Sequence, residues 1–271
     1  MTQNKEELDL TDDAVYYGKE ANWRYLSVSQ YKDFRRCEAR ALAKLKGDWE
    51  EFSNPQALLV GNFVHSYFES PEAHEKFLDD NSSSLYKKDG NLYKCFEVAN
   101  DMISRIKREP LFNYLWEGQK ETVVTGELFG VEWKGKIDLL NLDKNYFVDL
   151  KTTAFLDKRF WDDDYKQYVG FIEAYGYVLQ LAVYEQLLLS KHNKDITGYI
   201  YAVTKQDPPD VAAIDVLKDK KEFELKLLQE NIQRVEQVKN GQEQPEGCGS
   251  CEYCRLNKEL EGFILSDHLI N

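Results

Sequence analysis

Several features that would place this chain in a special class of protein are missing. No run of about 18 consecutive apolar residues occurs, so the sequence predicts no membrane-spanning helix. The N-terminal stretch MTQNKEELDLTDD has neither the basic start nor the apolar run of a secretory signal peptide, and we therefore expect a cytoplasmic protein. Disulfides are not expected in that reducing compartment, which leaves metal binding or simple burial for the five cysteines.

Positive charge is also scarce, with 35 Lys and Arg against 48 Asp and Glu and a net charge of −13. Such a chain is not expected to wrap nucleic acid with its whole surface, because phosphate contacts need Lys and Arg. A local groove stays open, since the stretch from Tyr31 to Lys46 carries six basic residues, among them Arg35 and Arg36, against two acidic ones. A solvated helix face explains this run equally well.

Folded structure is predicted for most of the chain, because 42% of its 271 residues are hydrophobic and 13% are aromatic. We expect a flexible acidic segment over residues 1–20, then a single α/β domain over residues 21–271. Apolar residues at helical spacing predict helices over residues 26–47, 57–70, 93–107, 171–189 and about 225–235. Strands are predicted over residues 121–129, 131–140, 145–153, 197–204 and 211–216. This order favours a small mixed sheet of about five strands with helices on both sides.

The segment YFVDLKTT, residues 146–153, places charges where burial is expensive. Asp149 and Lys151 follow three apolar residues, and alternate residues of a strand share one face. Asp138, in the preceding predicted strand, can meet Asp149 if the two strands pair across the short turn. Two carboxylates so close repel each other unless a cation lies between them, and Mg²⁺ or Mn²⁺ binds through a few carboxylates. We therefore expect a divalent metal here, with Lys151 beside it.

These residues belong to a longer ordered pattern. Gly61 and His65 form G-x-x-x-H on an upstream helix, and Gln180 and Tyr184 lie four residues apart on a downstream helix, as QLAVY. With Asp138 in GKID and the run Asp149-Leu150-Lys151, the pattern resembles the PD-(D/E)XK nuclease superfamily. Within it, the pattern is similar to the RecB-like branch, including phage exonucleases of the exodeoxyribonuclease VIII type and CRISPR-associated RecB-like nucleases. The resemblance runs from Leu26 to Arg255.

The resemblance implies a restriction-endonuclease-like core and a metal-dependent DNA exonuclease of phage or prophage recombination or repair. DNA would be its substrate and a recombination protein a possible partner. The metal ligands that it implies are the side chains of Asp138, Asp149 and His65 and the backbone carbonyl of Leu150. Lys151 would be the catalytic lysine. Residues that would point at DNA or at the catalytic strand are Gln180 and Tyr184, with Arg35 and Arg36 positioning the DNA.

Each of these residues has an ordinary explanation when it is taken alone. His65 could be a core histidine, Asp138 a turn cap, and Gln180 with Tyr184 plain helix surface; their joint order argues against that set of coincidences. Glu127 is a further candidate carboxylate. No metal is assigned to the acidic run Asp162, Asp163 and Asp164, and surface positions are expected for His74, His192 and His268.

Three cysteines near the C-terminus, Cys248, Cys251 and Cys254, follow C-x2-C-x2-C spacing, which core burial does not explain. A remote fourth cysteine, Cys37 or Cys95, would complete a ligand set for a [4Fe–4S] cluster or for Zn²⁺. The resemblance favours Cys37 and an iron–sulfur cluster, although the last gap is shorter than in those nucleases; Cys95 is then an ordinary helix thiol. Either metal would join the N-terminal helix to the C-terminal tail in a structural role.

Two other functions stay open. The scaffold could serve as a non-catalytic module that binds DNA or a recombination partner. Alternatively, an unrelated interaction protein stapled by zinc would have no affinity for DNA.

Overall fold

The computed structural model describes residues 8–50, 55–259, 262, 263 and 265. The chain divides into two compact units, the first formed by Met1–Val28 with Phe52–Glu230 and the second by Ser29–Glu51 with Asn231–Asn271. The single domain expected over residues 21–271 stays a prediction. In the second unit two segments that are far apart in the sequence contact each other around the cysteines. None of the described helices is both long and apolar enough to cross a membrane.

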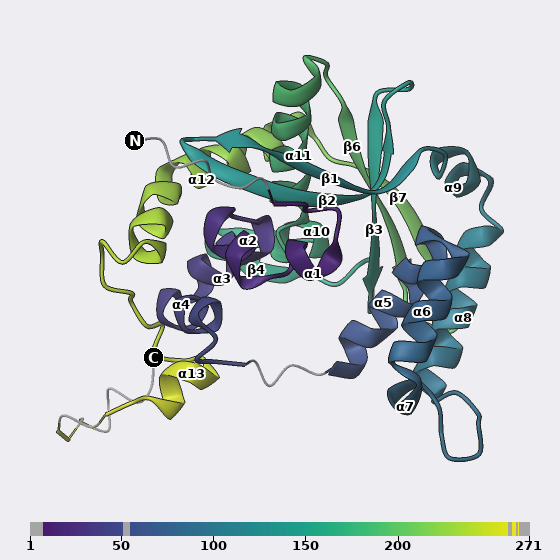
Figure 1. Ribbon diagram of the computed structural model, residues 1–271, viewed down its shortest axis with the longest axis horizontal. Coiled ribbons are helices and arrows are strands. Elements are labelled where there is room, and N and C mark those ends of the chain that lie inside the picture. Colours follow the sequence, from purple (N-terminus) through teal and green to yellow (C-terminus); the bar gives the residue numbers. More distant parts are fainter. Residues whose placement is uncertain (1–7, 51–54, 260–261, 264, 266–271) are drawn as a thin grey trace. The chain divides into compact units, whose positions relative to one another are not determined.

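A five-stranded mixed sheet forms the centre of the first unit (Figure 1). Its order is β1-β2-β3-β6-β7, with β3 parallel to β6 and every other neighbouring pair antiparallel. The fold is therefore the α/β, restriction-endonuclease-like architecture that the sequence predicted. The strands are β1 (Gln119–Leu128), β2 (Val131–Asn141), β3 (Tyr146–Thr153), β6 (Thr197–Thr204) and β7 (Val211–Asp215).

Apolar side chains cover one face of this sheet from three helices, α5 (Pro55–Glu69), α8 (Lys94–Lys107) and α9 (Pro110–Leu115). Their buried residues form one cluster with Leu139, Val148 and Leu150 of the strands. Because strand side chains alternate between faces, Asp149 projects away from this cluster. Burial of the cluster fixes which face of β3 presents the charged residues.

The opposite face of the sheet packs against α11 (Tyr177–His192). The ring of Tyr184 lies flat against β2 at Gly135, where a Cβ atom would overlap the ring. It also contacts the ring of Phe147, 6.2 Å away between centroids. Glycine at position 135 therefore lets this helix approach the sheet closely.

The remaining elements of the first unit connect these layers. The helices are α1 (Asp13–Tyr16), α2 (Lys19–Arg24), α6 (Pro71–Asp80), α7 (Ser82–Leu85), α10 (Phe171–Ala174) and most of α12 (Lys218–Lys239). Strands β4 (Phe160–Asp162) and β5 (Gln167–Val169) form a separate two-stranded sheet that the sequence did not indicate. The N-terminal segment, expected to be flexible, is helical in part, because Leu10 and Tyr16 are buried in a small apolar cluster.

Two predicted helices are each divided in the structure. The helix expected over 171–189 breaks into α10 and α11 at Gly176, whose φ of 66° lies in the left-handed region. The helix expected over 26–47 breaks into α3 (Val28–Arg36) and α4 (Glu38–Lys46). At this break Cys37 is extended, with φ −167° and ψ 105°. Apolar periodicity continues through both breaks, which is why the spacing alone predicted single helices.

Candidate functional site

Strands β2 and β3 separate at the two predicted aspartates. Their antiparallel ladder ends with Leu139 opposite Val148, so Asp138 and Asp149 are the first residues beyond it. The Asp138 carboxylate then reaches across to β3, where its Oδ2 accepts the backbone N–H of Leu150 at 2.7 Å. The sequence placed both aspartates at neighbouring strand positions, and the structure brings them together at this fork.

His65 of α5 approaches the same carboxylate. Its Nδ1 lies 3.6 Å from Asp138 Oδ2. Burial disfavours the charged imidazole, but the neighbouring Asp138 outweighs it and raises the pKa of His65. Conversely, His65 lowers the pKa of Asp138 against the opposing effect of burial. The pair therefore favours an ionised carboxylate facing a protonated imidazole, and a metal ion would have to displace the proton to bind the imidazole nitrogen.

Asp149 is almost fully buried, with 2% exposure, and has two side-chain partners. Lys151 Nζ lies 2.6 Å from its Oδ2, and Gln180 Nε2 of α11 donates to its Oδ1 at 2.7 Å. Burial raises the pKa of Asp149, with Lys151 acting in the opposite direction. Lys151 thus supplies the positive charge that a buried carboxylate at this position needs.

Lys151 is held from a second side by an aromatic ring. Its Nζ lies 4.6 Å from the ring centroid of Tyr177, in the first turn of α11. Burial opposes the charged ammonium, but Asp149 and then Asp138 raise the pKa of Lys151. The amine is therefore a fixed, protonated group beside both carboxylates. Tyr177 could not be predicted as part of the site, because an aromatic residue at the start of a helix is common and indicates no particular function.

Gln180 and Tyr184, the predicted pair on α11, lie in two different environments. Gln180 reaches the site through Asp149, whereas Tyr184 is 7% exposed and packs on Gly135 and Phe147. Tyr184 thus packs against the two strands that carry Asp138 and Asp149, and its role toward DNA stays a prediction. Its ring packs on β2 and β3 from the face of the sheet that α11 covers.

Glu121 of β1 is an acidic residue of this region that the sequence analysis missed. The β1–β2 ladder pairs Lys120 with Leu139 and Thr122 with Ile137, so Glu121 stands opposite Asp138 without being paired to it. Its φ is 48°, an uncommon value for a residue other than glycine, and such outliers concentrate at functional sites. The two-residue turn at Phe129–Gly130 sets this register, so the sequence did contain the signal.

Burial, with Asp138 adding to it, raises the pKa of Glu121 to about 7, although Lys136 lies 3.4 Å away. Glu69, one turn after His65 on α5, also has a raised pKa, caused mainly by burial. The region around Asp138 therefore carries more acidic groups than neighbouring cations neutralise at neutral pH. Added positive charge would be stabilised there.

We expect Glu121→Gln to stabilise the metal-free protein at pH 8 and to have little effect at pH 5. The folded-state pKa lies above the ordinary glutamate pKa of 4.5, so the wild-type protein loses stability as pH rises from there through about 7. The gain at pH 8 should be on the order of 1–3 kcal/mol, measured by urea denaturation in chelator. Glu127→Gln, an exposed position on the same strand, is the matched control. Equal pH dependence in wild type and Glu121→Gln would contradict the assignment.

Other predicted positions lie away from this site or outside the described part of the chain. Glu127 is exposed and pairs with Glu132, and the Asp162–Asp164 run begins at the last residue of β4 and continues into the turn after it. His74, expected at the surface, is half-buried: its Nδ1 lies 2.9 Å from Ser66 Oγ and its ring packs edge-on against Phe63. His192 is half-buried at the end of α11, and His268 lies outside the described residues.

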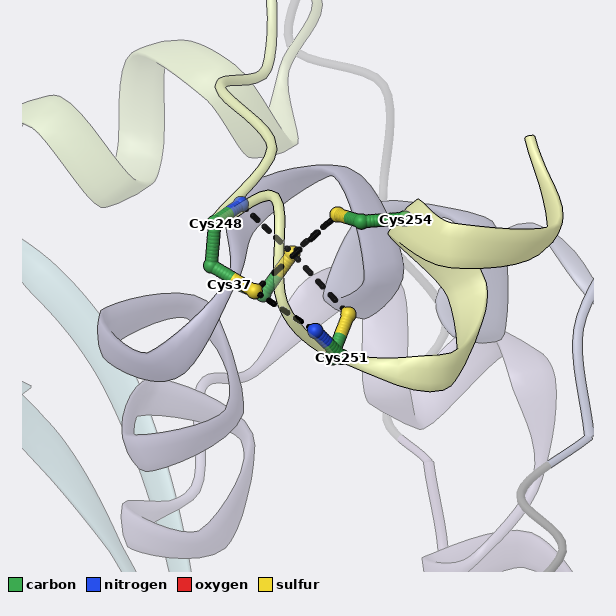
Figure 2. A group of neighbouring side chains, drawn as sticks. All are labelled: Cys37, Cys248, Cys251 and Cys254. Atoms are coloured by element: carbon green, nitrogen blue, oxygen red, sulfur yellow. Dashed lines mark hydrogen bonds between the residues drawn. The ribbon is translucent and has the colours of Figure 1, made fainter. Parts of the chain in front are cut away.

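The second unit brings together the four predicted cysteines (Figure 2). Cys37 comes from the α3–α4 junction, and Cys248, Cys251 and Cys254 come from the segment around α13 (Glu252–Leu256). All are free thiols, and their sulfur atoms lie within 4.8 Å of one another. Among the described residues this is the one such compact group of potential metal ligands. Cys95, the rejected alternative, lies in α8 and accepts a hydrogen bond from Gln56.

The basic residues proposed to position DNA also belong to the second unit. Arg35 and Arg36 are exposed at the end of α3, and Arg35 Nη1 donates to Asn231 Oδ1 at 2.8 Å. Their role toward DNA stays a prediction.

The donor atoms of both sites suit metals of different kinds. Asp138, Asp149 and His65 offer two carboxylates and an imidazole, with the two aspartate side chains 15% and 3% exposed, but their ligand atoms are not grouped as closely as the four sulfurs. Such oxygen-rich donors fit Mg²⁺ or Mn²⁺. The cysteines offer four soft sulfur donors, which fit zinc or iron.

A mixed sheet whose strands separate at two aspartates beside a lysine defines a PDDEXK-like fold. The family model for a PDDEXK-like domain of unknown function (DUF3799) matches residues 27–257, so the chain belongs to this family. A crystal structure from Eubacterium rectale, described as a "putative exonuclease", is 35% identical, with a TM-score of 0.88 over 96% of this chain and 97% of that one. Another structure, SSO0001, is 15% identical with a TM-score of 0.29 over 79% of this chain and 89% of that one, too low to inform the fold. No curated protein matches significantly.

Proposed function

We propose that this chain is a Mg²⁺- or Mn²⁺-dependent deoxyribonuclease that degrades DNA from its ends in phage or prophage recombination or repair. The observation that carries the proposal is the meeting of Asp138, Asp149 and Lys151 where β2 and β3 separate. Membership of a PDDEXK-like family and the similarity to a protein described as an exonuclease support it. A recombination protein is the proposed partner.

Asp138 and Asp149 would hold the divalent ion, together with the His65 imidazole and the Leu150 carbonyl. When bound, such an ion lowers the pKa of a water ligand and stabilises the charge that develops on phosphorus. The Leu150 N–H fixes the orientation of the Asp138 carboxylate. Proton loss from His65 is needed before its Nδ1 can bind a metal, so metal affinity should increase with pH.

Lys151 acts as a fixed cation next to the reacting phosphate. Its ammonium, held between Asp149 and the Tyr177 ring, can neutralise the scissile phosphate or hold the attacking hydroxide. Gln180 orients the Asp149 carboxylate by donating to Oδ1, which makes it a positioning residue. Arg35 and Arg36 are the proposed phosphate contacts.

The cysteines of the second unit would hold a metal with a structural role. They join the α3–α4 junction to the C-terminal segment, 211 positions apart between Cys37 and Cys248. A metal bound by both segments contributes its binding free energy to folding.

The activity is tested by incubating matched linear and closed circular DNA with the protein in Mg²⁺, Mn²⁺ or chelator. Degradation of the linear DNA alone, only in the presence of metal, is the expected result. A binding assay in chelator separates the alternatives. DNA that is bound but left intact in both metals would favour a non-catalytic DNA-binding module, and cleavage of circular DNA would replace the exonuclease with an endonuclease.

A further inference from the structure

The sulfur atoms of the cysteine group lie closer together than separate surface thiols would. Cys37 Sγ is 3.5 Å from Cys254 Sγ and 3.8 Å from Cys251 Sγ, and Cys248 Sγ is 4.0 Å from Cys254 Sγ (Figure 2). The longest of the six separations is within 4.8 Å. These distances are far too long for a disulfide bond, whose sulfurs are about 2.05 Å apart. The four sulfurs surround one small common space.

The size of that space distinguishes between two kinds of metal site. A single Zn²⁺ binds thiolates at about 2.3 Å, so the edges of its sulfur tetrahedron are about 3.8 Å. In a [4Fe–4S] cluster each cysteine binds a different iron, which holds the four cysteine sulfurs roughly 6 Å apart. The observed separations of 3.5, 3.8 and 4.0 Å agree with the single ion. A cluster would require every pair of cysteines to move apart.

The surroundings of the sulfurs can stabilise the excess negative charge of a metal ion bound by four thiolates. Four thiolates around one divalent cation carry a net charge of −2, which hydrogen-bond donors stabilise. Backbone N–H groups of Cys251 and Cys248 point at the sulfurs of Cys248 and Cys37, at 3.3 and 3.4 Å. The Ser250 hydroxyl lies 3.6 Å from Cys248 Sγ.

The polypeptide around the group is also fixed by contacts that involve no sulfur. The Ala39 N–H donates to the Glu246 carbonyl at 3.0 Å, and the Glu246 N–H donates to the Glu38 carboxylate at 2.8 Å. Arg234 donates to both oxygens of the same carboxylate, at 2.9 and 2.8 Å. Separating the two cysteine-bearing segments to admit a cluster would disrupt these bonds, because they lie directly beside Cys37 and Cys248.

We propose that Cys37, Cys248, Cys251 and Cys254 bind one tetrahedral Zn²⁺ rather than the iron–sulfur cluster that the sequence pattern favoured. The inference rests on the proposal that these cysteines hold a metal, and it does not depend on nuclease activity. Zinc has no redox chemistry, so the site is a structural link between the two segments of the second unit.

The test is metal and sulfide analysis of the full-length protein, purified both with and without oxygen. One zinc per chain is expected, with no brown colour and no acid-labile sulfide in either preparation. Exchange of the zinc for Co²⁺ should give the intense visible absorption of a tetrahedral cobalt–thiolate site. Iron with sulfide in the oxygen-free preparation would overturn zinc but keep a metal, whereas no metal in zinc-supplemented preparations would remove both proposals.

Single serine variants assign the ligands. Cys37→Ser and Cys254→Ser should each reduce bound zinc from one per chain to a small fraction, because a three-thiolate site binds zinc much more weakly. Cys95→Ser should retain one zinc, since this thiol lies in α8 with Gln56 as its partner. If either ligand variant folds poorly, the cobalt spectrum of the wild-type protein decides the question. Unchanged zinc in Cys37→Ser would exclude Cys37 as a ligand.

Discussion

Asp149→Asn and Lys151→Met should each lower the rate of DNA degradation on the order of 10³-fold or more. Asn keeps the shape of the Asp149 side chain and its hydrogen bond with Gln180 but cannot supply the charge that a metal ion needs. Met keeps the length of the lysine stem but removes the cation 2.6 Å from Asp149. The measurement is the initial rate of nucleotide release from end-labelled linear DNA at saturating Mn²⁺.

Both variants are expected to fold. Burial raises the pKa of Asp149, so its carboxyl group can take up a proton when Lys151 is replaced, and urea denaturation of both variants measures the stability that loss of the buried ion pair costs. Asp101→Asn and Lys194→Ala are the matched controls, because both positions are exposed and lie more than 40 residues from Asp149 and Lys151 in the sequence. The assignment fails if Asp149→Asn or Lys151→Met retains wild-type rates, or if the controls lose activity to the same extent.

The sheet of the first unit could be predicted because its signals are local. Alternating apolar residues mark β1, β2 and β3, and the short connections force neighbouring strands to pair in antiparallel fashion. Once those registers are set, Asp138 faces the Asp149 position on one side and Glu121 on the other. The sequence analysis used only the first of these two neighbours. Extending the hairpin register back from Gly130 would have identified Glu121 as well.

Features that depend on contacts between distant segments could not be predicted in this way. The break at Cys37 interrupts a continuous apolar pattern. It is explained only by the folded structure, in which Cys37 lies beside the C-terminal cysteines. The same limit applies to Tyr184, whose burial depends on the absence of a side chain at Gly135. Lys221 lies in a run of charged residues at the start of α12, yet it is buried and its Nζ is 2.7 Å from Glu185 Oε1. Helical periodicity indicates that a residue is on a given face, and tertiary packing decides what that face meets.

Removing the metal from the cysteine group should destabilise the second unit far more than the first. Without the cation, four cysteines remain in one small space. Burial and hydrogen bonding with Cys37 and Cys251 raise the pKa of Cys254 to about 12, whereas hydrogen bonds from the Ser250 side chain and the Cys251 backbone lower the pKa of Cys248 to about 5. The link between the α3–α4 junction and the C-terminal segment then depends mainly on the Glu38–Arg234 ion pair and its neighbouring bonds. Since the ion pair is partly exposed, it contributes little alone.

Amide hydrogen exchange measures this difference directly. After chelation, exchange in the segments around α4 and α13 should become on the order of 100-fold faster, because the free energy of metal binding no longer opposes local opening. Amides of β2 and β3 provide an internal control within the same sample, since their hydrogen bonds lie in the first unit and involve no cysteine. Adding back Zn²⁺ should restore the slow exchange. Metal-free protein whose second unit exchanges as slowly as before chelation would show that the metal contributes nothing to its folding, since the thiols and the ion pair alone would then hold the two segments together.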